Sequence, residues 1–246
     1  MTRNYFRSLS VLLLLALAAS AAYAAVILSP ARTWSSAPNY IIDDRGHAQI
    51  TDINGGATAT RNAVVSSVGW NSAGAGRVIT ATVGSVAGFT LGDGIPMLNF
   101  SDPIGVCSGS CIMASFTGFY SAGTIYDADI VTNPSAPFTS ELEDPGGAGC
   151  SGEFYVESIS THEFGHVLGL GHCPVSGSTM YPSVSTCNNA VASIEPADMD
   201  GILQLYGRPG SCAGSCGGSG PGCWCDSLCH QFGDCCHDKI SLCGYP

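Results

Sequence analysis

The run from His162 to His172 reads HEFGHVLGLGH and constrains the fold of this chain more than any other feature. If its first part is helical, His162 and His166 lie one turn apart on the same face, so both imidazoles can reach one metal ion. Gly169 is the residue type that can adopt a left-handed conformation, end the helix and let the chain bring back His172. The run therefore predicts a helix, a turn and three ligands around one metal.

Three protein ligands indicate a catalytic zinc ion, because a structural zinc ion usually has four and leaves no position open for water. Glu163 directly follows the first ligand and is expected to stand beside the ion as a general base. Zinc lowers the pKa of its bound water to roughly 7 and polarises a carbonyl group. The expected reaction is peptide-bond hydrolysis with one catalytic Zn²⁺, in which Glu163 deprotonates the water and later protonates the leaving amine.

The run resembles that of the metzincin metallopeptidases, which share HExxHxxGxxH followed by a methionine turn. The segment Ser178–Pro182 offers such a turn. The resemblance implies that Met180 packs beneath the three imidazoles and does not bind the metal. An ordinary core methionine is the alternative.

Within the metzincins, the neighbouring residues favour the matrixins, the matrix-metalloproteinase-like branch. Cys173 follows the third histidine, where astacins carry Glu and adamalysins Asp. Met180-Tyr181-Pro182 is similar to the matrixin methionine turn, residues 194–207 to the matrixin C-terminal helix, and residues 126–131 to a strand of that branch. The resemblance extends over roughly residues 34 to 207.

Several departures from the family limit what it implies. Animal matrixins hold a second, structural zinc with additional histidines, but His47 is the only histidine outside the motif and the C-terminal tail, so we expect one zinc. No Pro-Arg-Cys-Gly segment precedes the catalytic region, so the sequence does not indicate cysteine-switch latency. Asp127 and Asp129 could bind Ca²⁺ but lack a binding-loop pattern, so calcium is possible and unsupported. Val184 replaces a frequent pocket tyrosine, so pocket specificity cannot be carried over.

The first 24 residues have the layout of a secretory signal peptide. Arg3 and Arg7 precede an apolar run from Leu9 to Ala19, and Ala22-Tyr23-Ala24 follows it. This run is too short for a comfortable membrane span. We expect cleavage near Ala25 and a secreted, extracellular protein without a stable membrane span. An uncleaved anchor is the alternative.

The chain is acidic, with a formal net charge of −11 that becomes −13 when Arg3 and Arg7 are removed with the leader. Such a balance argues against nucleic acid or an anionic membrane as a partner. Residues 25–208 suffice for one domain that buries roughly 70% of its unfolded surface. We expect this domain to be the matrixin-like one.

The predicted fold class is α+β: a twisted mixed sheet with a long active-site helix and a C-terminal helix. Pro96 should confine the stretch 95–100 to a sheet edge. Matrixins place an edge strand bordering the cleft at 111–121, where a peptide could add by backbone hydrogen bonds; a plain core strand is the alternative. The expected helices are 62–70, 153–168 and one containing 199–206, and the expected strands are 78–83, 112–120 and 125–132.

Of the thirteen cysteines, five precede Gly207 and imply disulfides in a secreted chain. Cys107 and Cys111 can close a small loop. Cys173 and Cys187 bracket the methionine turn and could tie it to the metal helix. Cys150 would then be left over, as a buried thiol or in another disulfide.

Eight cysteines in the last part of the chain, after a linker at 208–211, predict a separate disulfide-rich domain at 209–246. They are Cys212, Cys216, Cys223, Cys225, Cys229, Cys235, Cys236 and Cys243. Spacing alone cannot choose among their pairings. The pattern resembles the somatomedin-B domain, which implies pairs 212 with 225, 216 with 243, 223 with 236, and 229 with 235.

Somatomedin-B domains commonly mediate protein binding, so the resemblance implies a docking role. Trp224 and Phe232 are candidate contact residues, although either could simply cover the disulfides. A metal cluster that includes His230 and His237 is the less favoured interpretation in an oxidising compartment.

The sequence as a whole predicts a secreted zinc metalloendopeptidase that cuts a protein or peptide substrate and uses its C-terminal module for protein docking. The alternative is a secreted adhesion or binding protein on an inactive metzincin scaffold. The presence of Glu163 argues against that alternative, because a site that has lost its activity need not retain the general base.

Overall fold

The computed structural model describes most of the chain. The described residues are 26–50, 55–75, 78–86, 88–140, 150–207, 210, 212, 214–220, 222–229, 235–236 and 239–243. The expected signal peptide, and His230, Phe232 and His237 of the C-terminal region, lie outside them.

A six-stranded mixed sheet forms the base of the larger unit. β6 lies next to β5 on one side, and β1 and β4 on the other, with β2 and β3 beyond β4. Only β5 runs antiparallel to its neighbour, and it forms an edge of the sheet, as predicted. The strands are β1 Thr33–Trp34, β2 Asn39–Asp43, β3 Thr80–Gly84, β4 Met97–Asn99, β5 Met113–Ser121 and β6 Thr124–Thr132.

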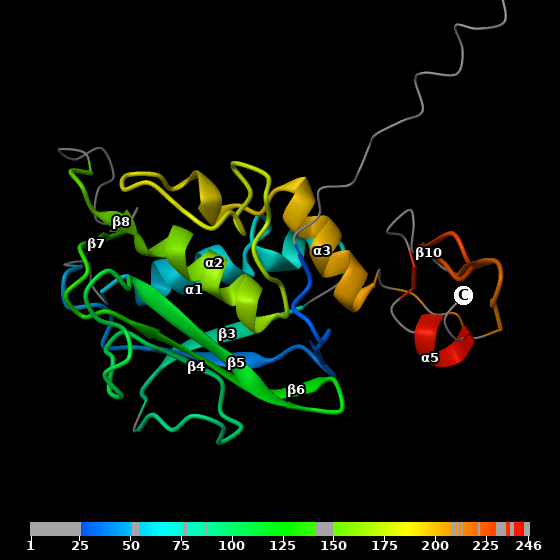
Figure 1. Ribbon diagram of the computed structural model, residues 1–246, viewed down its shortest axis with the longest axis horizontal. Coiled ribbons are helices and arrows are strands. Elements are labelled where there is room, and N and C mark those ends of the chain that lie inside the picture. The colour runs from blue at the N-terminus through cyan, green and yellow to red at the C-terminus, as the bar shows by residue number, and fades with distance from the viewer. Residues whose placement is uncertain are drawn as a thin grey trace, which may run out of the picture.

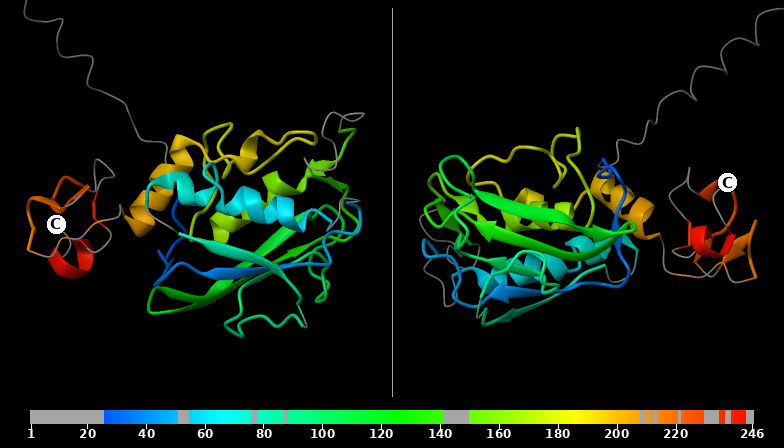
Figure 2. Two further views of the ribbon diagram at one scale, coloured as in Figure 1. Left: turned by 180° about the vertical axis from the view of Figure 1, so that it is seen from behind. Right: turned by 60° about the horizontal axis from the view of Figure 1, so that its bottom comes forward.

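Two helices, α1 (Ala57–Val65) and α2 (Val156–Val167), cover one face of this sheet (Figures 1 and 2). The core lies between them and the sheet, where Tyr40 and Phe164 meet edge to face with ring centroids 4.7 Å apart. α3 (Pro196–Tyr206) follows. The α+β prediction is confirmed. In the described parts of the chain, no helix has the length and apolarity needed to cross a membrane.

Short elements complete the unit. β7 (Phe138–Thr139) pairs in parallel with β8 (Phe154–Tyr155) directly before α2. This pairing explains why the helix begins at Val156, later than the predicted residue 153. Two 3₁₀ turns, η1 (Trp70–Ala73) and η2 (Ala190–Ala192), lie in the connections.

The first helix lies earlier in the chain than predicted. α1 ends before Ser66, whose hydroxyl accepts hydrogen bonds from Val68 N (3.2 Å) and Gly69 N (3.0 Å). A serine side chain that binds nearby backbone N–H groups competes with the helical pattern. The apolar residues at 63, 64 and 68 therefore do not belong to one helix that reaches Trp70.

The position of β4 contradicts the edge-strand prediction drawn from Pro96. β4 lies between β2 and β6, inside the sheet. Pro96 directly precedes the strand, and its carbonyl accepts the N–H of Ile41 at 3.1 Å. Since a proline at this position removes no donor from the ladder, it is compatible with an interior strand.

Two disulfides lie in the larger unit, and one differs from the prediction. Cys107 and Cys111 are bonded as expected. Cys187 pairs with Cys150, not with Cys173. Cys173 is a buried thiol within the core, because its backbone N–H is bonded to the carbonyl of Met180 and its side chain turns inward. Closeness in sequence therefore predicted the first of these pairs but not the second.

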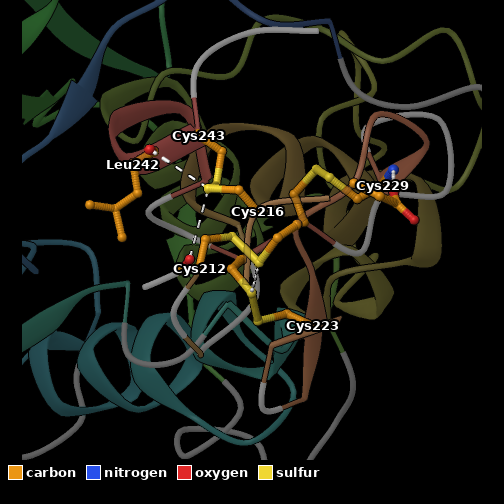
Figure 3. Close-up of a disulfide and its surroundings, with 10 residues drawn as sticks. Cys212, Cys216, Cys223, Cys229, Leu242 and Cys243 are labelled. Carbon is orange, nitrogen blue, oxygen red and sulfur yellow. Dashed lines mark hydrogen bonds between the residues drawn. A yellow bond between two sulfur atoms is a disulfide. The ribbon is translucent and has the colours of Figure 1, made fainter. Parts of the chain in front are cut away.

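The C-terminal region is held by cysteines (Figure 3). Its four disulfides join the pairs that the somatomedin-B resemblance implied: Cys212–Cys225, Cys216–Cys243, Cys223–Cys236 and Cys229–Cys235. The elements with described bounds in this region are β9 (Ser219–Gly220), β10 (Cys223–Trp224) and α5 (Lys239–Cys243). Cross-links replace an apolar core in a segment this small.

Candidate metal centre and substrate cleft

Helix α2 presents the first two histidines of the motif from one face. The Nδ1 atom of His162 lies 2.6 Å from the carbonyl oxygen of Thr179, and that of His166 lies 2.8 Å from the carbonyl oxygen of Leu170. A ring that donates its Nδ1–H to a carbonyl keeps the lone pair of Nε2 for a metal. Both rings are therefore oriented as metal ligands are.

The third histidine reaches the site because the helix stops abruptly. Gly169 has φ +105°, and its N–H bonds to the carbonyl of His166 at 2.9 Å. A Cβ atom there would lie 2.5 Å from the carbonyl oxygen of Arg32, so only glycine fits. After this turn the ring of His172 lies 5.4 Å and 4.9 Å, between centroids, from those of His162 and His166.

The three imidazoles suit a metal ion in composition, and the two on α2 suit it in protonation as well. Their candidate ligand atoms all lie within 4.8 Å of one another. Burial lowers the pKa of His162, and burial together with the neighbouring His162 lowers the pKa of His166 to about 4. Neutral imidazole is the form that binds a metal. The set matches a three-histidine zinc site with one position left for water.

Glu163 stands in the same cleft. Burial raises its pKa to about 7, and hydrogen bonds from the hydroxyl and backbone of Ser115 partly offset this rise. A bound dication would lower the pKa further. Ser115 lies on β5, within a strand that the sequence predicted. No motif marked this contact, which arises only when β5 packs against α2.

The methionine turn follows the third histidine, and Met180 is fully buried. Its packing beneath the imidazoles stays a prediction. Gly165 makes this burial possible, because a Cβ atom on it would collide with the sulfur of Met180 and the ring of Trp70. Asp198, at the start of α3, holds the turn. Its carboxylate accepts hydrogen bonds from the Ser178 hydroxyl (2.5 Å) and the backbone N–H groups of residues 179 (2.9 Å) and 180 (3.1 Å).

Sequence reasoning missed this role of Asp198. The signal that could have found it is the helix start, because Asp198 occupies position N3 of a capping box begun by Glu195. The same carboxylate then serves two purposes, capping α3 and fixing the turn.

A cavity of about 250 Å³ opens beside Glu163. Its walls come from the start of β5, from α2 and from the chain after the methionine turn, and most of the side chains are apolar. Val184, at the position expected to differ from the family, lies in the wall. The lining residues are Ile112, Met113, Phe154, Ser158, Ile159, His162, Glu163, Thr179, Tyr181, Pro182, Ser183, Val184 and Val191.

His47 is held by hydrogen bonds and packing within the fold. Its Nε2 lies 3.0 Å from the carbonyl oxygen of Asn133, and its Nδ1 accepts the N–H of Gln49 at 3.2 Å. The ring is buried against Phe138, with centroids 4.7 Å apart, and burial lowers its pKa. Both nitrogens are therefore already committed to backbone groups.

The two acidic residues considered for calcium are buried on β6, on the same side of the strand. Met97 N donates to Asp129 Oδ1 at 3.2 Å, and among the described residues no donor reaches Asp129 Oδ2. Burial and the adjacent Asp127 raise the pKa of Asp129 to about 7, while burial also raises that of Asp127. This environment favours a proton or a cation and does not decide between them.

These features together define a metallopeptidase-type catalytic domain. They are the mixed sheet, the helix with two histidines, the turn that brings back a third histidine, and the buried methionine. The chain matches the Matrixin family over residues 80–207 and the Somatomedin B domain over residues 210–246. It belongs to the matrixin family, which is zinc-dependent, and carries a C-terminal somatomedin B domain. Both resemblances seen in the sequence are confirmed.

Similar proteins include plant and animal metalloproteinases. Metalloendoproteinase 5-MMP of Arabidopsis thaliana is 30% identical over 149 residues, which cover 54% of this chain and 41% of that protein. Metalloendoproteinase 2-MMP of the same plant is 46% identical over 52 residues (21% and 14%). Matrilysin of Rattus norvegicus is 44% identical over 50 residues (20% and 19%). The chain thus spans less than half the length of each of these relatives.

The contact between Gly165 and Met180 can be tested by adding one methyl group. Gly165→Ala should displace the methionine turn and lower the free energy of unfolding by about 1–3 kcal/mol, as overpacking does. Urea unfolding measures the change. Gly118→Ala is the matched control, because a Cβ atom there meets nothing within 4 Å. Equal stability of the two variants would contradict the packing described here.

The raised pKa of Asp129 predicts a pH dependence of stability in the absence of divalent cations. The folded state keeps this proton up to about pH 7, whereas the unfolded state loses it near the ordinary pKa of 3.8, so this group makes stability fall as pH rises between those values. Asp129→Asn should remove that part of the slope in chemical unfolding with EGTA present. Parallel curves for the two proteins would contradict the assignment. Stabilisation of the wild type alone by added Ca²⁺ would support calcium binding.

Proposed function

We propose that this protein is a secreted zinc-dependent endopeptidase. The observation that carries the proposal is the convergence of three imidazoles, two of which have a pKa lowered by burial, with Glu163 beside an apolar cavity. His162, His166 and His172 would hold one zinc ion, and Glu163 would act as general base and acid. The relatives named above as metalloendoproteinases support this assignment.

When bound, zinc supplies Lewis acidity that activates water and polarises the scissile carbonyl. The residues of the chain transfer the proton and position the ligands. Glu163 accepts the proton of the attacking water and delivers it to the leaving amine. A carboxylate beside the bound ion can make both transfers, because it takes up the proton in one step and releases it in the next. The carbonyls of residues 179 and 170 keep the two helical imidazoles in position.

The cleft favours an extended peptide with an apolar side chain near the cleaved bond. β5 presents an unpaired edge among the described strands, and a substrate strand can add to it through backbone hydrogen bonds. Ile112 and Met113, at the start of this strand, also line the cavity. Backbone pairing would provide affinity for many sequences, while the cavity would select one side chain.

Secretion is proposed from the expected leader and from the six disulfides, which persist in oxidising compartments. The somatomedin B domain is proposed to dock a protein partner. Three large apolar side chains on it are about half exposed: Trp224 (47%), Leu228 (52%) and Leu242 (52%). Exposed aromatic and aliphatic groups on a rigid small domain are suited to protein contact.

Glu163→Ala tests the catalytic role. The variant should retain about one zinc ion per chain, since the three imidazoles are unchanged, but should lose at least about 10²-fold in peptide-cleavage rate without its general base. Zinc content is measured by atomic absorption and cleavage with a quenched fluorescent peptide library. Asp200→Ala, an exposed carboxylate on α3, is the matched control and should cleave normally.

The outcome also decides between the proposed function and its alternative. A wild-type protein that binds zinc but cleaves no peptide, casein or gelatin would favour an adhesion or binding protein on an inactive scaffold. Cleavage that a chelator abolishes and zinc restores would exclude that alternative.

The docking role can be tested with Trp224→Ala in the full chain. If the module recruits protein substrates, turnover of gelatin should fall several-fold, while kcat/KM for a short peptide stays unchanged, because the peptide needs only the cleft. Equal rates of wild type and variant on both substrates would argue against a contact role for Trp224.

A further inference from the structure

One wall of the cavity lacks the support of a sheet or an α-helix. Residues 181–184 and Val191 line the cavity, and the chain between them consists of turns and irregular structure up to the short η2. Segments of this kind are positioned by specific cross-links, and without them they move more freely than helices and strands. Residues 181–191 are here called the cavity wall, and their position depends on the contacts that hold them.

A disulfide fixes the far side of the cavity wall. Cys187 is bonded to Cys150, with Cα atoms 5.3 Å apart. The backbone N–H of Cys187 also donates to the carbonyl of Glu153 at 2.8 Å, and Gly152 N lies 3.3 Å from the Cys187 sulfur. Glu153 directly precedes β8 and α2. The wall is thus linked to the segment that leads into the helix carrying His162 and Glu163.

The next residues of the wall are held by α2 itself. The hydroxyl of Ser158, one turn before His162, lies 3.0 Å from the carbonyl oxygen of Asn188 and 2.9 Å from Oδ1 of Asn189. Thr179 Oγ1 donates to the carbonyl of Val191 at 2.9 Å. Anchors at residues 187, 188 and 191 therefore connect the wall to the metal helix and the methionine turn.

The backbone of Cys187 adds an independent observation. Its φ is +57°, in the left-handed region that residues other than glycine seldom adopt. Such a conformation is strained and persists only where surrounding contacts impose it. The disulfide and the hydrogen bond to Glu153 are the contacts that act on this residue.

We propose that the Cys150–Cys187 disulfide is a specificity-determining element: it holds the cavity wall against α2 and so sets which substrate side chain the cavity accepts. Cys150 and Cys187 touch no reacting atom and act as positioning residues. The inference rests on the proposed peptidase function. A disulfide that served only the stability of the fold would leave substrate selection unchanged.

The test compares the full-length wild type with Cys150→Ala/Cys187→Ala. Two quenched peptides differ only in one residue beside the cleaved bond, which is small in one peptide and large and apolar in the other. We expect the ratio of their kcat/KM values to shrink by about fivefold or more, mainly through KM, because a loosened pocket discriminates size less well. Zinc content and kcat for the preferred peptide should change little.

Cys216→Ala/Cys243→Ala is the matched control, since it removes a disulfide from the somatomedin B domain and should keep the selectivity ratio. Asn189→Ala is a second probe that loosens the wall without altering a cysteine or the cavity lining. Asn189→Ala should shift the ratio in the same direction, and it replaces the double variant as the test if that variant does not fold.

A folded double variant, or Asn189→Ala, with wild-type selectivity and only a lower melting temperature would overturn the inference while the peptidase assignment stands. A wild type that cleaves no peptide would instead overturn the proposed function and this inference together. The two failures are therefore distinguishable.

Discussion

The carboxylate of Asp198 is the contact on which the metal centre depends most. It is fully buried and accepts hydrogen bonds from three successive residues of the methionine turn. The middle one, Thr179, uses its carbonyl to hold His162. One side chain at the start of α3 therefore sets the position of a turn, and the turn sets the orientation of a ligand. A buried polar network of this kind is stabilising only when each member is satisfied.

The opposite side of the centre depends on two glycines, whose lack of a side chain leaves room for neighbouring groups. Gly165 leaves room for Met180 and Trp70, and Gly169 leaves room for the carbonyl of Arg32. The freed carbonyls at the end of α2 find aromatic donors: Trp34 Nε1 binds the carbonyl of residue 167 at 2.9 Å, and Tyr206 OH binds that of residue 168 at 2.7 Å. The helix can thus end inside the protein without unpaired backbone groups.

Features set by local geometry could be predicted from the sequence. Histidines at i and i+4, and a glycine that ends the helix, need only the helical repeat, and the structure brings them together as expected. Features set by distant contacts could not. The interior position of β4, the pairing of Cys150 with Cys187 and the contact of Ser115 with Glu163 each join segments far apart in sequence. The resemblance to somatomedin B supplied the C-terminal pairing, which spacing alone leaves open.

On the proposed function, the two sides of the cleft would provide different kinds of substrate recognition. The edge of β5 offers backbone groups, which are the same for every peptide, so it can provide affinity with little selectivity. The cavity offers side-chain contacts, and its volume depends on where the irregular wall lies. Packed strands and helices resist displacement, whereas irregular chain follows its anchors. Selectivity in this protein would therefore depend on few contacts, and these can change without altering the metal centre.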